Sequence, residues 1–386
     1  MIRYMTAGES HGKSVSAIID GIPAGLKITP GYIDRQLARR QAGYGRGGRM
    51  DIEKDTVEIT AGIRWGETIG SPVCLSVKNR DWDNCRDIMD ISGTSRDREK
   101  YLTKPRPGHA DLAGALKYNR EDMRDILERA SARETAARVA AGALARKLLE
   151  EFGVTVLSYT CRIGDISADI KDTDALDPET VDSSPLRCPD SGAEAGMMKL
   201  IDRASEDGDT LGGVFTIVIR GVPVGLGSHT QWDMKLDARL AFALMSIQAI
   251  KGVGAGAGFG AAAMPGSEMH DTILYDPERS IFRRNSNNSG GFEGGITNGE
   301  DIILSAAMKP INSLRKPLES VDMKSKEKVL SEIVRSDVCA VPAAGIVGEA
   351  ATALEVARAL KEKFGGDSVG EMKRNYESYL EQLRNF

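Results

Sequence analysis

The sequence predicts one large domain that mixes helices and strands, of the α/β or α+β class. Helix-like and strand-like segments alternate along the 386 residues, but not in regular βαβ units. Glycine is frequent, with 42 residues, and aromatic residues make up only 5%, which favours strands joined by tight turns. No linker-like segment divides the chain and no internal repeat is visible, so we expect a single domain over residues 1–386.

Local patterns assign the elements in chain order. Helices are predicted over 32–41, 131–152, 233–250, 343–364 and 369–386, and the second and third carry the strongest signals. The helix at 131–152 has the clearest start, because Ser131 and Glu134 have the spacing of a capping box. Strands are predicted over 56–63, 72–77, 154–161, 211–224 and 302–308. The polar segments near 80–104 and 165–192 show no clear period and are expected to be surface excursions.

Charge balance and cysteine content exclude several classes of protein. The net charge of −5 gives no reason to expect nucleic acid as a partner. Five widely spaced cysteines without a C-x-x-C pair argue against a disulfide framework and a structural zinc site, so no metal is expected. No segment approaches the roughly 18–20 apolar residues of a membrane span, and no signal peptide is visible, so we expect a cytoplasmic protein without a membrane partner. Serine-hydrolase, P-loop and zincin motifs are also absent.

Two of the four histidines lie in glycine- or proline-flanked loops beside arginine-rich stretches. His11 is in the segment 8–12, Gly-Glu-Ser-His-Gly, and His109 is in the segment 106–111, Arg-Pro-Gly-His-Ala-Asp. An imidazole that changes charge near neutral pH, placed beside fixed positive charge, suggests proton transfer to or from an anion. A lone loop histidine is more often structural than catalytic, so the pattern by itself leaves both interpretations open.

Arginine-rich segments predict anion binding. Four arginines fall within eleven residues, at Arg39, Arg40, Arg46 and Arg49, the last two in a glycine-rich loop whose backbone can approach a ligand. The segment 129–131, Arg-Ala-Ser, lies at a predicted helix N-terminus, where free N–H groups favour an anion. A plain helix cap with solvent-facing arginines is an equal alternative there. The segment 335–337, Arg-Ser-Asp, is by pattern no more than a helix terminus.

Together these segments resemble the motifs of the chorismate synthase family. The matching segments are 8–12 with 20–23, 45–50, 106–111, 129–136 and 335–337, in the family's order over nearly the whole chain. The resemblance implies an α+β fold, a β-α-β sandwich of that family's own type, usually assembled as a homotetramer. It implies the anti 1,4-elimination of phosphate from 5-enolpyruvylshikimate 3-phosphate, with loss of the C6 pro-R hydrogen, to give chorismate. It also implies a need for reduced FMN (FMNH2), although the reaction has no net redox change.

The resemblance assigns roles by position. It implies that His11 protonates the departing phosphate, that His109 partners the reduced flavin near N1, and that Asp337 works with flavin N5. Flavin contacts are implied for Arg129, Ala130, Ser131, Gln248, Ala249, Gly294, Lys309, Pro310, Ile311, Asn312, Ser313 and Arg335. Substrate contacts are implied for Ser10, Arg49 and Arg133, and Arg335 is implied in these as well. Arg40 and Arg46 match NADP positions of the family, but an equal alternative is that they hold substrate.

Two other functions remain open from the sequence. One is a non-catalytic binder of phosphorylated metabolites, built on the same arginine loops. The other is a flavin reductase with its own NADPH site. The glycine-rich run 251–260 follows a predicted helix rather than a strand, so we reject it as a dinucleotide fingerprint. We therefore expect a separate flavin reductase, with NADPH as an indirect reductant.

Overall fold

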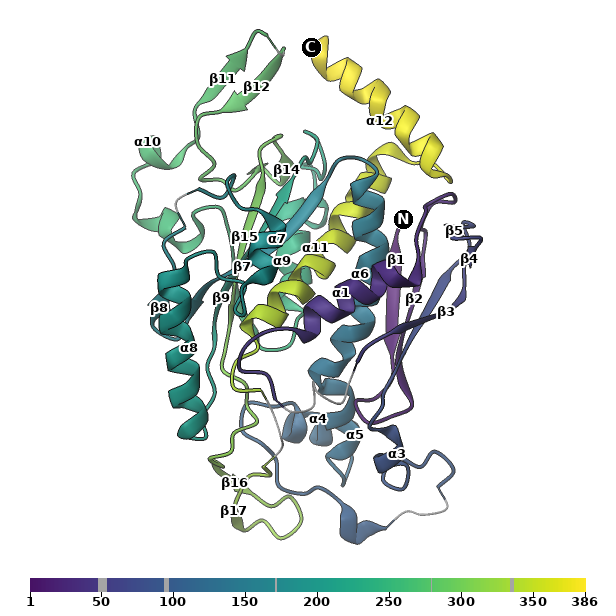
Figure 1. The fold of residues 1–386 in the computed structure, drawn as a ribbon, viewed down its shortest axis with the longest axis vertical. Helices are drawn as coiled ribbons and strands as arrows, with labels where there is room; N and C mark the ends of the chain where they lie inside the picture. Colours follow the sequence, from purple (N-terminus) through teal and green to yellow (C-terminus); the bar gives the residue numbers. More distant parts are fainter. Residues whose placement is uncertain (48–53, 94–96, 171, 279, 334–336) are drawn as a thin grey trace.

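Two long helices lie at the centre of the molecule with a β-sheet on either side. The computed structural model describes residues 1–47, 54–93, 97–170, 172–278, 280–333 and 337–386. The central helices are α6 (Thr135–Glu150) and α11 (Val341–Phe364), with α1 (Pro30–Gln41) packed against both (Figure 1). One sheet packs against α6 and the other against α11. This arrangement is the β-α-β sandwich that the resemblance implies, and it confirms the α+β class.

The first sheet contains four antiparallel strands in the order β1-β2-β6-β3. They are β1 (Arg3–Ala7), β2 (Ser14–Asp20), β6 (Val73–Lys78) and β3 (Val57–Ala61). Residues alternate between the two faces of a strand, so β2 buries Val15, Ala17 and Ile19 while Ile18 is half exposed. The buried face of this sheet rests on α6.

The second sheet contains five strands in the order β10-β15-β9-β7-β8. They are β10 (Ile250–Ala255), β15 (Ile302–Met308), β9 (Gly213–Arg220), β7 (Thr155–Ile163) and β8 (Ile166–Ser167), all paired antiparallel. Its buried side chains, such as Phe215 and Ile217, join those of the first sheet and the central helices in one hydrophobic core. This continuous core supports our proposal of a single domain.

The two central helices approach closely because small residues line their contact. α6 reads TAARVAAGALARKLLE and buries alanines on most of its circumference, as expected for a helix enclosed on all sides. A Cβ added at Gly142 would lie 2.4 Å from the Cβ of Ala350 on α11. Only glycine at position 142 therefore permits the observed separation of the helices.

A buried ion cluster joins these helices to their neighbours. Glu349 of α11 accepts hydrogen bonds from Arg39 of α1 at 2.7 Å, Arg146 of α6 at 2.6 Å and Arg187 at 3.0 Å. It also accepts from the backbone N–H of Ser158 on β7 at 2.8 Å. Burial opposes ionisation, but the three guanidinium groups hold the pKa of Glu349 well below its usual range. The cluster fixes α1, α6, α11 and β7 relative to one another.

Several predicted elements are confirmed. The helices expected over 32–41, 343–364 and 369–386 correspond to α1, α11 and α12 (Val369–Arg384). The strand expected over 302–308 is β15, and those over 56–63, 72–77, 154–161 and 211–224 contain β3, β6, β7 and β9 within about two residues at most ends. No helix in the described ranges is long and apolar enough to cross a membrane.

Two predicted helix boundaries are wrong. Ser131 caps a 3-10 turn, Ala132–Glu134, and α6 begins only at Thr135. The carboxylate of Glu134 accepts a hydrogen bond from Thr6 on β1, so the tertiary contact replaces the reciprocal half of a capping box. The helix expected over 233–250 is α9 (Leu236–Met245). It ends early because Ala249 turns the chain at a φ of 68° and residues 250–255 pair with β15.

Shorter elements complete the described chain, and the sequence analysis missed most of them. The remaining helices are α3 (Trp82–Cys85), α4 (Asp111–Tyr118), α5 (Arg124–Ala130), α7 (Pro178–Ser183), α8 (Ser191–Glu206) and α10 (Gly266–Met269). The remaining strands are β4 (Ile63–Arg64), β5 (Glu67–Thr68), β11 (Ile273–Asp276), β12 (Ile281–Arg284), β13 (Phe292–Glu293), β14 (Ile296–Thr297), β16 (Glu319–Val321) and β17 (Lys328–Leu330). The missed strands β1 and β2 and helices α4 and α5 matter most, since they carry the loops of the site.

The close approach of α6 and α11 predicts opposite effects for one substitution at two glycines. Gly142→Ala should destabilise the protein by about 1–3 kcal/mol, because the new methyl group overlaps Ala350. Gly31→Ala, at an exposed position of α1 with open space around it, should stabilise by about 0.4–1 kcal/mol. Urea unfolding of both variants at equal protein concentration measures the two effects. Equal changes in the free energy of unfolding of the two variants would contradict the packing of α6 against α11.

Candidate active site

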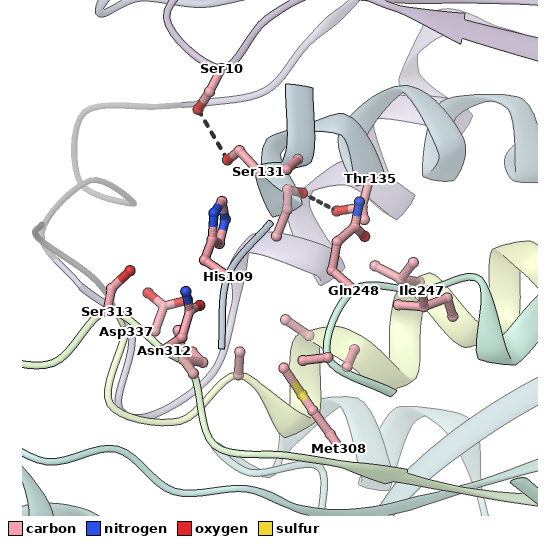
Figure 2. A pocket seen from close by; sticks show the side chains of 18 of the residues that line it. Ser10, His109, Ser131, Thr135, Ile247, Gln248, Met308, Asn312, Ser313 and Asp337 are labelled. Atoms are coloured by element: carbon pink, nitrogen blue, oxygen red, sulfur yellow. Dashed lines mark hydrogen bonds between the residues drawn. The ribbon is translucent and has the colours of Figure 1, made fainter. Parts of the chain in front are cut away.

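A cavity of about 570 Å³ opens beside the N-terminal ends of α6 and α11. Its walls come from the turn after β1, the loop before α4, the end of α5, the α9–β10 turn and the segment after β15. Figure 2 shows Asn312, Ser313 and Asp337 on one side of the cavity and Gln248 and Thr135 on the other. This volume is within the roughly 300–1,000 Å³ typical of sites that enclose a small molecule.

The cavity gathers most of the residues that the sequence singled out. Its lining includes Ser10, His11, Arg40, Arg46, His109, Ala130, Ser131, Gln248, Ala249, Lys309, Ile311, Asn312, Ser313 and Asp337. These residues come from segments spread over more than three hundred positions of the chain. Four other predicted site residues with described positions are not in the lining: Arg129, Arg133, Gly294 and Pro310. Arg49 and Arg335 lie outside the described residues.

Arg129 and Gly294 lie apart from the cavity lining for different reasons. The guanidinium group of Arg129 donates to the backbone carbonyls of Thr6 and Gly8, at 3.0 and 3.3 Å, and so holds the turn after β1 against α5. Gly294 lies in the hairpin turn between β13 and β14, with a φ of 60°, close to His229. Pro310 lies between two lining residues, Lys309 and Ile311.

Arg40 and Arg133 share a buried carboxylate. Asp55 accepts from Arg133 at 2.6 Å and from Arg40 at 3.4 Å. Arg133 also donates to the side-chain oxygen of Asn79 at 2.7 Å, and Arg40 donates to Thr135 at the start of α6 at 3.0 Å. Burial lowers the pKa of Arg40 to about 10, with Asp55 opposing the shift, so Arg40 keeps its positive charge at neutral pH.

His11 is held by Glu128 of α5. The Nδ1 atom of His11 lies 2.9 Å from Oε1 of Glu128, and the backbone N–H of His11 donates to Oε2 of the same carboxylate at 2.8 Å. Burial opposes ionisation of Glu128, but the contacts with His11 lower its pKa overall. The neighbouring Ser10 accepts a hydrogen bond from the hydroxyl of Ser131 at 3.2 Å, which joins two walls of the cavity (Figure 2).

His109 has a matching arrangement with Asp111. Its Nδ1 atom lies 2.5 Å from Oδ1 of Asp111, and Arg106 donates to Oδ2 of that carboxylate at 2.9 Å. Arg106 also donates to the hydroxyl of Ser313 across the cavity at 3.0 Å. Burial acts against ionisation, yet hydrogen bonds from His109 and Arg106 lower the pKa of Asp111 to about 2.

Asp337 faces the cavity from the segment that precedes α11. Its carboxylate forms an ion pair with Arg46 at 2.9 Å and accepts the backbone N–H of Gly47 at 2.7 Å. The loop 43–47 can approach because Gly45, at a φ of 79°, has no Cβ to meet Ile201 or the backbone of Cys339. The predicted loop of glycine and arginine thus does bring Arg46 to the site.

Two buried amide atoms in the cavity wall have no hydrogen-bond partner among the described residues. They are Oε1 of Gln248, an acceptor, and Nδ2 of Asn312, a donor. Unpaired buried polar atoms are costly, so each is expected to bind a polar group of a ligand. Apolar side chains share the lining with them, among them Ile247, Met308 and Ile311. An apolar wall that also offers a donor and an acceptor suits a flat heterocycle that carries amide groups.

The electrostatics of the lining favour an anionic ligand. Among the described residues, four fixed cations line it, Arg40, Arg46, Arg106 and Lys309, against two carboxylates, Asp81 and Asp337. The first turns of α6 and α11 also reach the cavity, and the positive ends of helix dipoles add to its potential. Across the described ranges, no cluster of His, Cys, Asp or Glu could hold a metal ion.

The sequence analysis missed the buried carboxylates that support these groups. Asp111 lies in the motif 106–111, where no local pattern gives it a role, and no local pattern indicates Asp55 or Glu128. Glu128 directly precedes the segment 129–131, but its contact with His11 spans 117 positions of the chain. No local pattern reports such a partner. The one available signal was a charged residue on a short helix beside the anion-binding segment.

The His109–Asp111 pair predicts a pH-dependent contribution to stability. Because the pKa of Asp111 falls from 3.8 to about 2 on folding, its stabilising effect is present above pH 4 or so and disappears as the pH falls through 2. Asp111→Asn should lower the free energy of unfolding by about 1–2 kcal/mol at neutral pH, after allowance for solvent screening. Urea unfolding of the wild-type and variant proteins at decreasing pH should show that the difference between their free energies of unfolding becomes smaller in acid. A difference that stays constant with pH would contradict this assignment.

Comparisons with known proteins identify the family to which this chain belongs. A family model described as chorismate synthase matches residues 2–360. The chorismate synthases of Desulforamulus reducens and Geobacter sulfurreducens are each 57% identical to this chain, with 100% of both sequences covered in each comparison. A crystal structure of a chorismate synthase matches with a TM-score of 0.81 and 42% identity, covering 100% of this chain and 99% of that one. The chain described here belongs to the chorismate synthase family.

Proposed function

We infer that this cavity carries out the family's reaction, the elimination of phosphate from 5-enolpyruvylshikimate 3-phosphate to give chorismate. The observation that carries the assignment is the meeting of His11, His109 and Asp337, from three distant segments, in one cation-lined cavity. A binder of phosphorylated metabolites would need the cations alone. Proton transfer needs groups such as the two imidazoles, each of which is held by its own carboxylate.

The charges of the substrate match those of the lining. 5-Enolpyruvylshikimate 3-phosphate carries two carboxylates and one phosphate. Arg40, Arg46, Arg106 and Lys309 supply fixed positive charge, and burial lowers the pKa of Lys309. We assign the three arginines, with Ser10, to holding the substrate, and Lys309 to the flavin segment 309–313. Arg133 contributes indirectly in this proposal, because it anchors the carboxylate that Arg40 shares.

The residues of the cavity fit the reduced FMN that this family uses. We propose that FMN is held by Ala130, Ser131, Gln248, Ala249 and the segment 309–313, where the unpaired Gln248 and Asn312 atoms lie. When bound, reduced FMN supplies an electron-rich ring beside the reacting carbons, without net redox change. The apolar wall would exclude water from one face of that ring. Arg129 would act by holding its neighbours in place.

The protein's own groups account for the proton movements. His11 would donate a proton from Nε2 to an oxygen of the departing phosphate, since its Nδ1 is occupied by Glu128. The adjacent guanidinium groups would stabilise the negative charge that develops on the phosphate. We assign His109 to hydrogen bonding with the reduced flavin. In this proposal Asp337, which is paired with Arg46, assists the removal of the C6 hydrogen as a proton.

The anaerobic formation of chorismate tests the proposed function. Purified protein with chemically reduced FMN should convert 5-enolpyruvylshikimate 3-phosphate to chorismate. His11→Ala should lower kcat by about 10²–10⁴-fold and leave flavin binding intact, because it removes only the general acid. His270→Ala, at an exposed position away from the lining, is the matched control and should keep the full rate. Substrate binding without turnover by folded, flavin-loaded wild-type protein would instead establish a non-catalytic binder.

We propose that reduced flavin comes from a separate reductase, with NADPH acting only indirectly. Arg40 and Arg46 lie in the same cavity as the histidines and are bonded to Asp55 and Asp337, which favours contact with substrate over a separate nucleotide site. Stopped-flow mixing of the protein and oxidised FMN with NADPH should therefore show no oxidation above that of free FMN. Rapid oxidation of NADPH would show that the protein reduces its own flavin.

We further propose a cytoplasmic homotetramer, the usual assembly of this family. Several large apolar side chains are exposed on the single chain, among them Phe242 and Met245 of α9 and Trp232 in the turn before it, at 77%, 50% and 81%. Exposed apolar side chains gathered near one element are typical of an interface between subunits. Light scattering of the purified protein tests this assembly, and the mass of a monomer would contradict it.

A further inference from the structure

We propose that Glu128 is a positioning residue for His11, holding the imidazole with Nδ1–H toward α5 and Nε2 toward the cavity. The proposal rests on the proposed function, in which His11 protonates the departing phosphate. None of the roles implied by the family resemblance falls on Glu128. It would act through His11 rather than by touching substrate or flavin.

The contacts of Glu128 secure both the loop and the ring. Its side chain is only 1% exposed. One carboxylate oxygen accepts the backbone N–H of His11 at 2.8 Å, and Nδ1 of the ring lies 3.0 Å from this oxygen and 2.9 Å from the other. The backbone carbonyl of Glu128 separately accepts the N–H of Ser10 at 3.0 Å. The main chain therefore docks the turn after β1, while the side chain is left to orient the imidazole.

The ionised carboxylate determines which ring nitrogen carries the proton. A carboxylate can only accept hydrogen bonds, so Nδ1 must donate to it. Arg124, one turn earlier on α5, lies 3.5 Å from Oε1 and helps to keep Glu128 ionised. With Nδ1 occupied, Nε2 is the nitrogen that remains for a ligand in the cavity, which His11 lines. When both nitrogens are protonated, Glu128 stabilises the imidazolium that acts as the acid.

The second imidazole of the cavity shows the same design independently. His109 directs Nδ1 to Asp111, a carboxylate that is 1% exposed and pairs with Arg106. Each ring thus has a buried carboxylate at Nδ1 and an arginine that contacts this carboxylate, and Arg106 also lies 3.0 Å from Nδ1 of His109 itself. Because this arrangement recurs on two unrelated elements of one cavity, we infer that it serves the orientation of the rings rather than local packing alone.

Kinetics of Glu128→Gln separate positioning from a purely structural role. The amide keeps the size of the side chain, but it replaces one acceptor oxygen by an NH2 group and removes the negative charge that stabilises the imidazolium of His11. We expect kcat to fall about 10–100-fold with little change in KM, because the loss concerns the transition state. The matched control is Asp125→Asn on the same helix, whose carboxylate pairs with the exposed Arg120 and should leave turnover unchanged.

A double mutant shows whether the effect passes through His11. In a His11→Ala background, Glu128→Gln should cause no further loss of turnover, since the ring it orients is gone. An equal loss in both backgrounds would overturn the proposal, as would full turnover in the single Glu128→Gln variant. Glu128→Asp, which keeps a carboxylate, should recover part of the rate lost in Glu128→Gln.

Solid-state NMR of protein labelled with ¹⁵N-histidine determines the tautomer of His11 without an activity assay. The chain has only four histidines, and the His11→Ala protein identifies the signals of His11. In the wild-type protein, Nδ1 of neutral His11 should carry the proton, and a proton on Nε2 instead would overturn the proposal. This readout needs no substitution at Glu128 and stays valid if Glu128→Gln fails to fold. If the wild-type protein formed no chorismate, the proposed function would fail while this test of positioning remained.

Discussion

The close packing of α6 against α11 is the constraint on which the remaining structure depends. Gly142 lets the two helices approach at Ala350, and each helix carries one sheet on its outer side. Their first turns consequently reach the same cavity. Thr135, the first residue of α6, and Ala340, directly before α11, line its wall. The Glu349 cluster joins α1 to this pair through Arg39. The next residue in the chain, Arg40, lines the cavity. Packing at the centre thus determines where the charges of the site lie.

Buried carboxylates then orient the cationic groups before any ligand arrives. Asp55 lies behind Arg40, Asp111 behind His109 and Glu128 behind His11. Each acid compensates charge on the side away from the cavity and leaves the other side of its partner available. A site whose dipoles and charges are already oriented spends little free energy on rearrangement during reaction, which is the main source of electrostatic catalysis. The cost is the burial of ionised groups, which is tolerable because each acid is paired.

The sequence singled out residues of the cavity more completely than it predicted the elements around it. Histidines and arginines in glycine-rich loops leave a local pattern, so His11, His109 and Arg46 could be named as candidates, although only the family resemblance gave the two histidines their roles. Partners such as Glu128 and Asp55 could not, because their contacts join segments 117 and 78 positions apart. The 3-10 turn before α6 was missed for a related reason, since Glu134 accepts a hydrogen bond from Thr6 on β1, a contact that no local pattern reports. The strand β10 was missed because pairing with β15, rather than its glycine-rich composition, decides its conformation.

The central claim is that one cavity, lined by both imidazoles, holds reduced flavin together with a substrate that has three anionic groups. A crystal structure of the protein with FMN and 5-enolpyruvylshikimate 3-phosphate tests it most directly. The account predicts both ligands in this cavity, with the substrate phosphate at His11 and flavin groups bonded to Gln248 Oε1 and Asn312 Nδ2. Either ligand bound at a different part of the protein, with those two amide atoms still unpaired, would contradict it.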